Sequence, residues 1–104
     1  MTNKDKLMSV VFPKWYEGLA EFEHTYKGYL NDVRIKMASG KVYTLSFVVN
    51  QRLGQSLADN VSAGLSYFTE KNLVVIPSIE RAIILKAIND MHKDELLENM
   101  FLSD

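Results

Sequence analysis

The amino-acid sequence predicts an α+β fold: a single domain, 1–104, with a largely antiparallel sheet and helices packed on one face of it. Two observations carry this prediction. Apolar and polar residues alternate on both sides of a glycine-containing turn in residues 33–49, as in a β-hairpin. Apolar residues then recur at helical spacing in residues 50–64 and again in residues 79–91. No linker or internal repeat divides the chain, so we expect one core.

The N-terminal third leaves two assignments open. Residues 1–6 are polar, and we expect them to be flexible. Residues 7–30 are apolar without a clean period, which fits a short helix near residues 14–17 with a strand around 19–23, or two short strands. The apolar stretch 7–12 is shorter than a signal-peptide core and than the ~20 residues of a membrane helix. The sequence therefore predicts neither secretion by that route nor membrane insertion.

The predicted hairpin has a buried face and a solvated face. Its polar side carries Arg34 and Lys36, and Lys41 lies just past the turn at residues 39–40. Residues 24–52 contain five Lys or Arg residues against one acid. The residues expected to face the core are Val33, Ile35, Met37, Tyr43, Leu45, Phe47 and Val49.

Beyond the hairpin the sequence predicts a helix, a second hairpin and a buried strand. Asn50 can cap the helix, and Gly64 suits the left-handed position at its end. Residues 65–69 and 73–76 are β-prone runs separated by three polar residues, which indicates the second hairpin. The run 73–76 lacks alternation, so we expect a central strand covered on both faces. The apolar stripe of the helix is Leu53, Leu57 and Val61.

Two helices are expected in the C-terminal part. Pro77 stops the preceding strand, and Ser78 can cap a helix that begins at Ile79. Asp94 can cap a final helix. The predicted order is a mixed N-terminal region followed by β-β-α-β-β-α-α. The stripe of the longer helix is Ile79, Ile83, Ala87 and Met91, which indicates deep packing.

The sequence contains no catalytic, metal-binding or phosphate-binding motif. Cysteine is absent, and His24 and His92 do not stand at metal-ligand spacing. The glycines are isolated, so there is no phosphate-binding loop, and no G-x-S-x-G nucleophile elbow occurs. We therefore predict a non-enzymatic protein with no cofactor and no metal. The net charge of −1 indicates no general attraction to nucleic acid or to an anionic membrane.

Candidate protein-contact residues fall into two groups. In the first group three neighbouring glutamates stand beside an aromatic pair, and aromatic anchors bordered by charge are how interfaces concentrate binding energy. The alternatives are a solvated acidic face for the glutamates and core packing for the aromatic pair. The second group is basic, and its alternative is the solvated face of a half-buried sheet. The candidates are Trp15, Tyr16, Glu17, Glu21 and Glu23 in the first group and Arg34 and Lys36 in the second.

Several segments between residues 33 and 91 occur in an order that is also found in a known protein family. They are residues 39–47, Arg52-Leu53, Gly64 with Tyr67-Phe68, residues 72–76, and Ile79 with Ile83. In these segments the chain resembles small bacterial immunity proteins of contact-dependent inhibition and related polymorphic toxin systems. The resemblance implies a non-enzymatic protein that binds a cognate toxin domain tightly and blocks its active site or its activation. Its positions are mostly core-forming, so it carries over no toxin-contacting residue.

Two other functions stay open. The apolar chain end Met100, Phe101 and Leu102 must either dock on its own domain or find another copy, which suggests a cytoplasmic regulatory or adaptor domain that forms homo-oligomers such as a homodimer. The other function is that of a small enzyme with a site shared across a dimer interface, using Glu21, His24 or Tyr26. The leading expectation is a cytoplasmic protein whose partner is a toxin domain, with no nucleic acid and no membrane involved.

Overall fold

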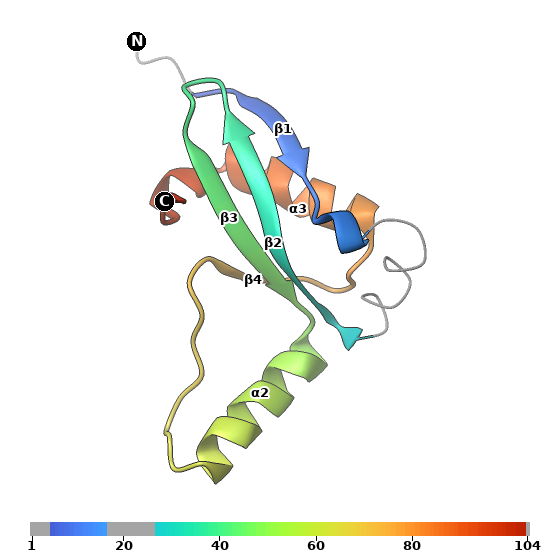
Figure 1. Cartoon of the computed structure of the whole chain (residues 1–104), viewed down its shortest axis with the longest axis vertical. Helices are drawn as coiled ribbons and strands as arrows, with labels where there is room; N and C mark the ends of the chain where they lie inside the picture. The colour runs from blue at the N-terminus through green and yellow to red at the C-terminus, as the bar shows by residue number, and fades with distance from the viewer. Residues whose placement is uncertain (1–4, 17–26, 104) are drawn as a thin grey trace.

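The structure is a computed structural model that describes residues 5–16 and 27–103, with the backbone alone at Trp15. A four-stranded mixed sheet carries one helix behind it, and a second helix projects beyond the end of the sheet (Figure 1). The α+β class is thus confirmed, and the element order differs from the predicted one. The elements are β1 (Leu7–Val11), η1 (Lys14–Tyr16, a short 3-10 helix), β2 (Tyr29–Met37), β3 (Val42–Val48), α2 (Asn50–Ser62), β4 (Leu73–Val75), α3 (Arg81–Lys93) and η2 (Leu97–Asn99).

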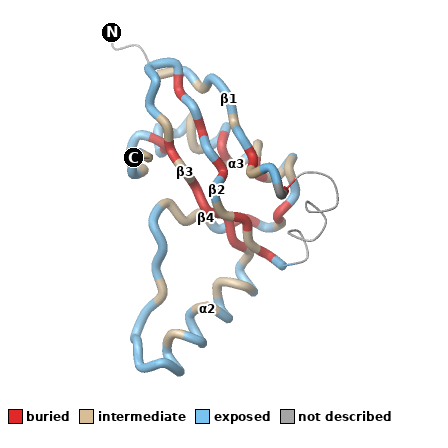
Figure 2. Tube along the Cα trace, viewed as in Figure 1, coloured by how far each residue is buried: buried red, intermediate tan, exposed pale blue. Residues whose placement is uncertain are grey.

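The predicted hairpin is β2 and β3, which pair antiparallel. β1 pairs antiparallel with the other edge of β2, and β4 pairs parallel with β3. The sheet is mixed because the chain crosses from β3 to β4 through α2, and a crossover connection makes the strands parallel. Figure 2 shows buried stretches along β2 and β3, where Val33, Ile35, Leu45 and Phe47 have no exposed surface.

Two irregularities in strand pairing explain why the sequence left β1 and the start of β2 undecided. The register of β2 against β3 shifts between Leu30 and Val33, and Asp32 between them has a φ of 65°. The shift lets Leu30 and Val33 both face the core although they are three positions apart. The register of β1 against β2 shifts in the same way between Leu7 and Ser9. Strict alternation of apolar and polar residues is therefore interrupted in both segments.

The predicted second hairpin is wrong. Residues 63–72 contain no strand, and β4 is a short edge strand rather than a central strand, with Val75 51% exposed. The lack of alternation in residues 73–76 is not due to a strand covered on both faces. Val74 packs against the core, Leu73 lines a hollow beside α2, and Ile76 enters the core just past the end of the strand.

α3 covers the face of the sheet that forms the core. Ile84 and Ile88 are its buried residues, and both belong to the same apolar cluster as the inward side of β2 and β3. The helix begins at Arg81, two residues later than predicted, and no side chain caps its first turn, so Ser78 is not the N-cap. Ile79 is buried ahead of the helix. The rest of the predicted stripe borders the buried residues and is half-buried: Ile83, Ala87 and Met91.

A carboxylate joins the start of the described chain to the turn between β2 and β3. Asp5 accepts hydrogen bonds from the backbone N–H of Ser39 at 3.0 Å and from its hydroxyl at 2.5 Å. The hydroxyl bond is the main reason that the pKa of Asp5 lies below its usual value. A lowered pKa in the folded state means that the contact stabilises the fold above the unfolded pKa and is lost as pH falls through the folded pKa.

We expect Asp5→Asn to lower the melting temperature slightly at neutral pH and to make no difference once the pH is below the folded pKa of Asp5. The reason is that Ser39 loses a charged acceptor at neutral pH, whereas the protonated wild-type carboxyl has already lost it in acid. Thermal melts over a series from neutral pH down to about pH 2 measure both values. Asp59→Asn removes the same charge from an exposed position on α2 and serves as the control. An equal effect of Asp5→Asn at both ends of this series would contradict the expectation.

Candidate interaction surface

The residues that the sequence predicts to contact a partner lie in different environments. Arg34 and Lys36 are exposed on β2, on the sheet face that points away from α3. Tyr16 is fully buried, so for this residue the packing alternative holds. The structure therefore brings together the basic pair and does not place Tyr16 beside it on a surface. The other candidates lie outside the described part of the chain: the Trp15 side chain, Glu17, Glu21 and Glu23.

Tyr16 closes one end of the core. Its ring stacks on that of Phe12 with the centroids 5.2 Å apart, and its hydroxyl donates to the backbone oxygen of Ile79 at 3.2 Å. The guanidinium carbon of Arg81 lies 4.3 Å from the Phe12 centroid and 5.6 Å from the Tyr16 centroid. These contacts join η1 to the segment that leads into α3. Because all the partners are more than 60 residues away except Phe12, local sequence could not distinguish this packing from an exposed aromatic.

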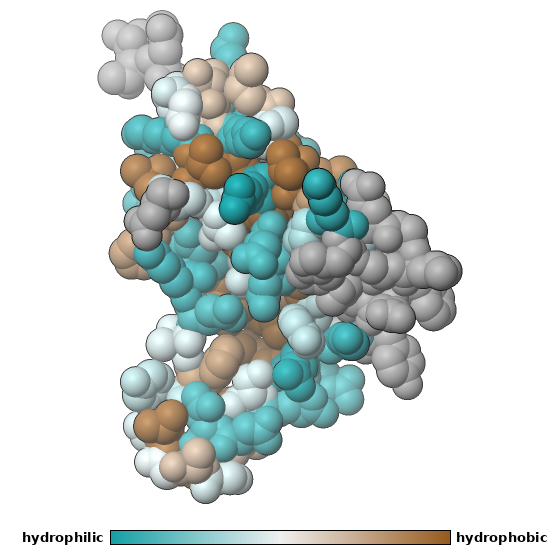
Figure 3. Space-filling model, in the orientation of Figure 1, coloured by the Kyte–Doolittle hydropathy of each residue, from teal (hydrophilic) through white to brown (hydrophobic). Residues whose placement is uncertain are grey.

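The open face of the sheet carries a shallow groove between β2 and residues 100–103, which we call the C-terminal tail. Two adjoining hollows of about 400 and 310 Å³ form it, and both are lined by Arg34, Leu102 and Ser103. Lys41 lines the first hollow, and Lys71 lines the second. Figure 3 views this face, where hydrophilic side chains alternate with hydrophobic patches.

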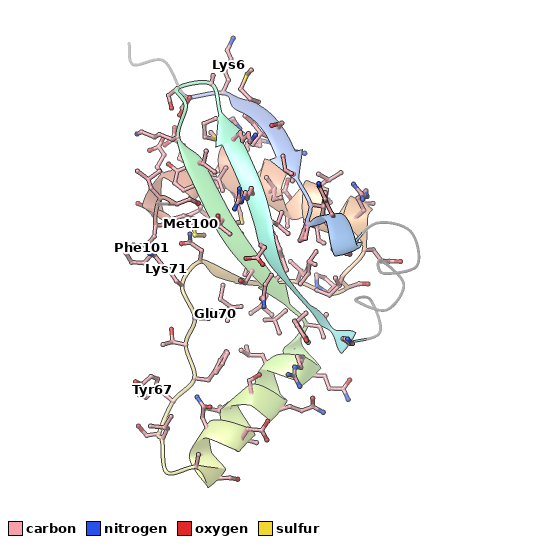
Figure 4. All side chains as sticks on the ribbon, in the orientation of Figure 1. Lys6, Tyr67, Glu70, Lys71, Met100 and Phe101 are labelled. Carbon is pink, nitrogen blue, oxygen red and sulfur yellow. The ribbon has the colours of Figure 1, made fainter. Side chains whose placement is uncertain are left out.

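Basic side chains outnumber acidic ones along the groove. Asp32 is the acid among the residues that line it. The side chains of Arg34 and Lys36 make no ion pair or hydrogen bond with any described residue. Lys71 lies against Phe101, with its Nζ 5.0 Å from the ring centroid (Figure 4). Phe101 is 63% exposed, so the groove offers unpaired positive charge next to open apolar surface.

Hydrogen bonds fix the C-terminal tail along the edge of β3. Leu102 forms an isolated antiparallel bridge with Tyr43. The backbone N–H of Ser103 donates to the carbonyl of Val42 at 2.8 Å. The hydroxyl oxygens of Ser103 and Thr44 lie 2.6 Å apart. The tail thus occupies the half of the β3 edge that β4 leaves open.

Asn72, the residue before β4, joins the C-terminal tail to β3. Its amide nitrogen donates to the carbonyls of Thr44 at 3.0 Å and Phe101 at 2.8 Å, and its amide oxygen accepts from the N–H of Phe101 at 2.9 Å. Its backbone carbonyl accepts from the N–H of Ser46 at 3.1 Å. Asn72 has a φ of 54°, a left-handed conformation that asparagine tolerates better than most residues. The sequence showed a turn here and gave no sign of the bridging side chain.

The apolar chain end therefore docks on its own domain, one of the two outcomes expected for it. Met100 packs against the core, and Leu97 is buried within η2 (Figure 4 labels Met100 and Phe101). The final helix predicted from Asp94 is a single 3-10 turn, because Glu95 adopts a left-handed φ of 62° and ends α3 there.

Three ionisable groups outside the groove have structural partners: Lys86, Asp90 and His92. An i,i+4 ion pair at 2.7 Å joins Lys86 to Asp90 on the exposed side of α3, and this carboxylate raises the pKa of Lys86. Nε2 of His92 lies 2.7 Å from the backbone oxygen of Asp5, which connects the end of α3 to the start of the described chain. Among the described residues no three His, Asp or Glu side chains are grouped as a metal site. Neither described helix is long and apolar enough to cross a bilayer.

Comparison with known proteins gives no matching family model, no similar curated protein and no similar solved structure. The resemblance to immunity proteins accordingly stays a prediction from sequence. The class of protein has to be argued from the groove and from the surfaces around it.

Proposed function

We propose that this protein acts by binding another protein through the groove on its open sheet face. The observation that carries the proposal is the unpaired charge of Arg34, which lines the groove together with the exposed side chains of Phe101 and Leu102. Lys36 adds a second unpaired charge two positions further along the same face of β2. Interfaces combine apolar anchors with a charged rim that selects and orients the partner. A matching partner presents acidic side chains next to apolar ones.

Within this class we propose the inhibitor function that the resemblance to immunity proteins implies: a non-enzymatic cytoplasmic protein that neutralises a cognate toxin domain. Inhibition by binding needs shape and charge complementarity over about 800 Å² per partner and no reactive group. The groove supports this proposal because its walls are held by main-chain pairing and by Asn72, so its side chains are presented on a fixed backbone. We expect a 1:1 complex with nanomolar or tighter affinity.

The double substitution Arg34→Glu with Lys36→Glu is expected to weaken binding of the partner by at least about tenfold, because it sets like charges against an acidic surface. A tagged form of the 104-residue chain serves as bait in a lysate of its source organism, and the captured protein is identified by mass spectrometry and produced pure. Calorimetric titration then gives the dissociation constants for the wild type and the variant at low and high salt. The affinity of the wild type should fall with salt, and that of the variant should not.

The matched control is Lys86→Glu with Lys93→Glu, which changes the charge by the same amount on the exposed side of α3. It should bind as the wild type does. Micromolar weakness towards every protein of a broad panel would contradict the proposed function. Equal weakening by the two double variants would place the contact surface elsewhere and contradict the role of the groove.

A further inference from the structure

α2 stands away from the rest of the protein. It leaves the end of β3, and residues 63–72 return beside it to β4, so that the helix and this return segment form an arm beyond the sheet (Figure 1). None of the 13 residues of α2 is buried, and Figure 2 shows the whole arm exposed or half-buried. Contact within the arm is narrow: Asn60 donates to the carbonyl of Tyr67 at 2.9 Å, and Leu53 and Phe68 are half-buried.

An exposed helix of this length lacks the features that stabilise a helix in water. Isolated helices shorter than about 12–15 residues are marginal, and Gly54 weakens this one further. The predicted cap Asn50 is instead the first helical residue, no side chain caps the N-terminus, and the end turns lack the acidic and basic residues that favour the helix dipole. α3 has the same length but buries two isoleucines, ends on basic residues and carries the Lys86–Asp90 pair. The described residues therefore give α2 little of the stabilisation that α3 has.

One side of α2 is apolar and uncharged. Leu53, Leu57 and Val61 recur every fourth residue, and Leu57 and Val61 are 44% and 55% exposed. The charged residues of the helix are Arg52 and Asp59, and the helical period places both on the opposite side. Depletion of charge around exposed apolar residues is typical of the centre of a protein interface.

We propose that this side of α2 packs antiparallel against the same helix of a second copy of the chain. In a two-fold contact the same patch meets itself, so a patch of one charge would repel its copy, whereas this uncharged patch does not. Charged groups at an interface steer a different protein towards it and reject wrong partners, and this uncharged patch offers neither effect. An antiparallel pair also puts the two sheets at opposite ends of the helices, where they do not collide (Figure 1).

The return segment enlarges this contact. A 13-residue helix is about 20 Å long, which by itself gives less than the about 800 Å² per partner of a stable dimer. Leu65 and Tyr67 add exposed apolar surface next to the helix end, 49% and 59% exposed, and Figure 4 shows Tyr67 on the return segment away from the sheet. Gly54 has no other atom within 4 Å of where its Cβ would lie, so a second helix can approach closely there.

This dimer contact is separate from the groove and from the apolar residues of the C-terminal tail. It does not involve the groove, so loss of the dimer and loss of partner binding are separate results. It also does not involve the apolar residues of the C-terminal tail, from which the sequence suggested homo-oligomers.

Mass measurement of the full chain by sedimentation or light scattering at micromolar concentrations tests the proposal. The wild type should have twice the 11.9 kDa mass of one chain, and Leu57→Glu should raise the dimer dissociation constant at least about tenfold. Leu96→Glu is the matched control, because Leu96 is 47% exposed outside the arm, and it should stay dimeric. A wild type that has the mass of one chain, or a Leu57→Glu variant that associates as the wild type does, would overturn the proposal.

Disulfide trapping tests the pairing without a charged substitution and decides the case if Leu57→Glu does not fold. The chain has no cysteine, so each introduced thiol is unique. In an antiparallel pair centred on residue 57, Leu57→Cys should link to itself on mild oxidation, and Leu53→Cys should link to Val61→Cys in a mixture. Leu96→Cys should stay unlinked. Absence of both links in the arm variants would overturn the proposed pairing.

Discussion

Asn72→Ala is expected to lower the free energy of unfolding by about 2–4 kcal/mol, which urea denaturation followed by circular dichroism measures. Two causes add. The substitution removes the three hydrogen bonds that the Asn72 side chain makes to Thr44 and Phe101. It also places alanine at a φ of 54°, where a Cβ without a compensating local hydrogen bond is strained.

Two further variants separate these causes. Asn72→Gly removes the same hydrogen bonds but accepts the left-handed backbone, so it should be less destabilising than Asn72→Ala by about 1 kcal/mol. Glu95→Ala is the matched control, because Glu95 has a φ of 62° at an exposed position and its side chain joins no other described residue. It should change the free energy of unfolding by less than about 0.5 kcal/mol, because glutamate and alanine both carry a Cβ in this conformation. If Asn72→Ala lowers the free energy of unfolding as little as Glu95→Ala does, the side-chain bridge contributes nothing.

The Asn72 variants also bear on the proposed function. Because Asn72 holds Phe101 against the start of β4, its loss should release the C-terminal tail that forms one wall of the groove. We expect amide hydrogen exchange to become faster at Ser103, whose N–H donates to Val42 in the wild type. Affinity for the partner should fall together with this protection.

The part of the fold that the sequence predicts well is the part with regular spacing. The β2–β3 hairpin follows from alternation because one of its faces is buried along its length, as Val33 and Leu45 show. β1 and the start of β2 escape the same reasoning because each contains a register shift, between Leu7 and Ser9 in β1 and between Leu30 and Val33 in β2. β4 was mistaken for a central strand because its sequence is a continuous apolar run. Such a run is expected when both faces of a strand are covered, but it also occurs in this edge strand, where Val74 packs against the core and Leu73 lies beside α2.

The candidate surface could be predicted only in part, because the residues that form it are far apart in the sequence. Strand parity places Arg34 and Lys36 on the solvated face of β2, and the structure agrees. Lys71 and Leu102 reach the same groove because the tail pairs with β3, and that pairing depends on one asparagine side chain. For α2 the helical stripe was correctly found, but periodicity cannot say whether the stripe faces its own core or another molecule.

Tyr16→Ala is expected to cost about 3–5 kcal/mol of stability, the largest effect that we expect of any variant proposed for this chain. The substitution empties a fully buried site, removes the ring that stacks on Phe12 and removes the hydroxyl that donates to the carbonyl of Ile79. Tyr16→Phe keeps the ring and should cost about 0.5–1.5 kcal/mol for the hydrogen bond alone. Chemical denaturation measures both, and the second variant gives a result even if the first does not fold.

The same variants separate the two interpretations that the sequence left open for Tyr16. A core residue changes the free energy of unfolding, whereas a contact residue changes the affinity for a partner and leaves the fold intact. Tyr67→Ala is the matched control, because that ring is 59% exposed, and it should change the stability of one chain by less than about 0.5 kcal/mol. We expect Tyr16→Phe to bind the partner as the wild type does. Wild-type stability in Tyr16→Ala would contradict the packing of this ring between η1 and the segment before α3.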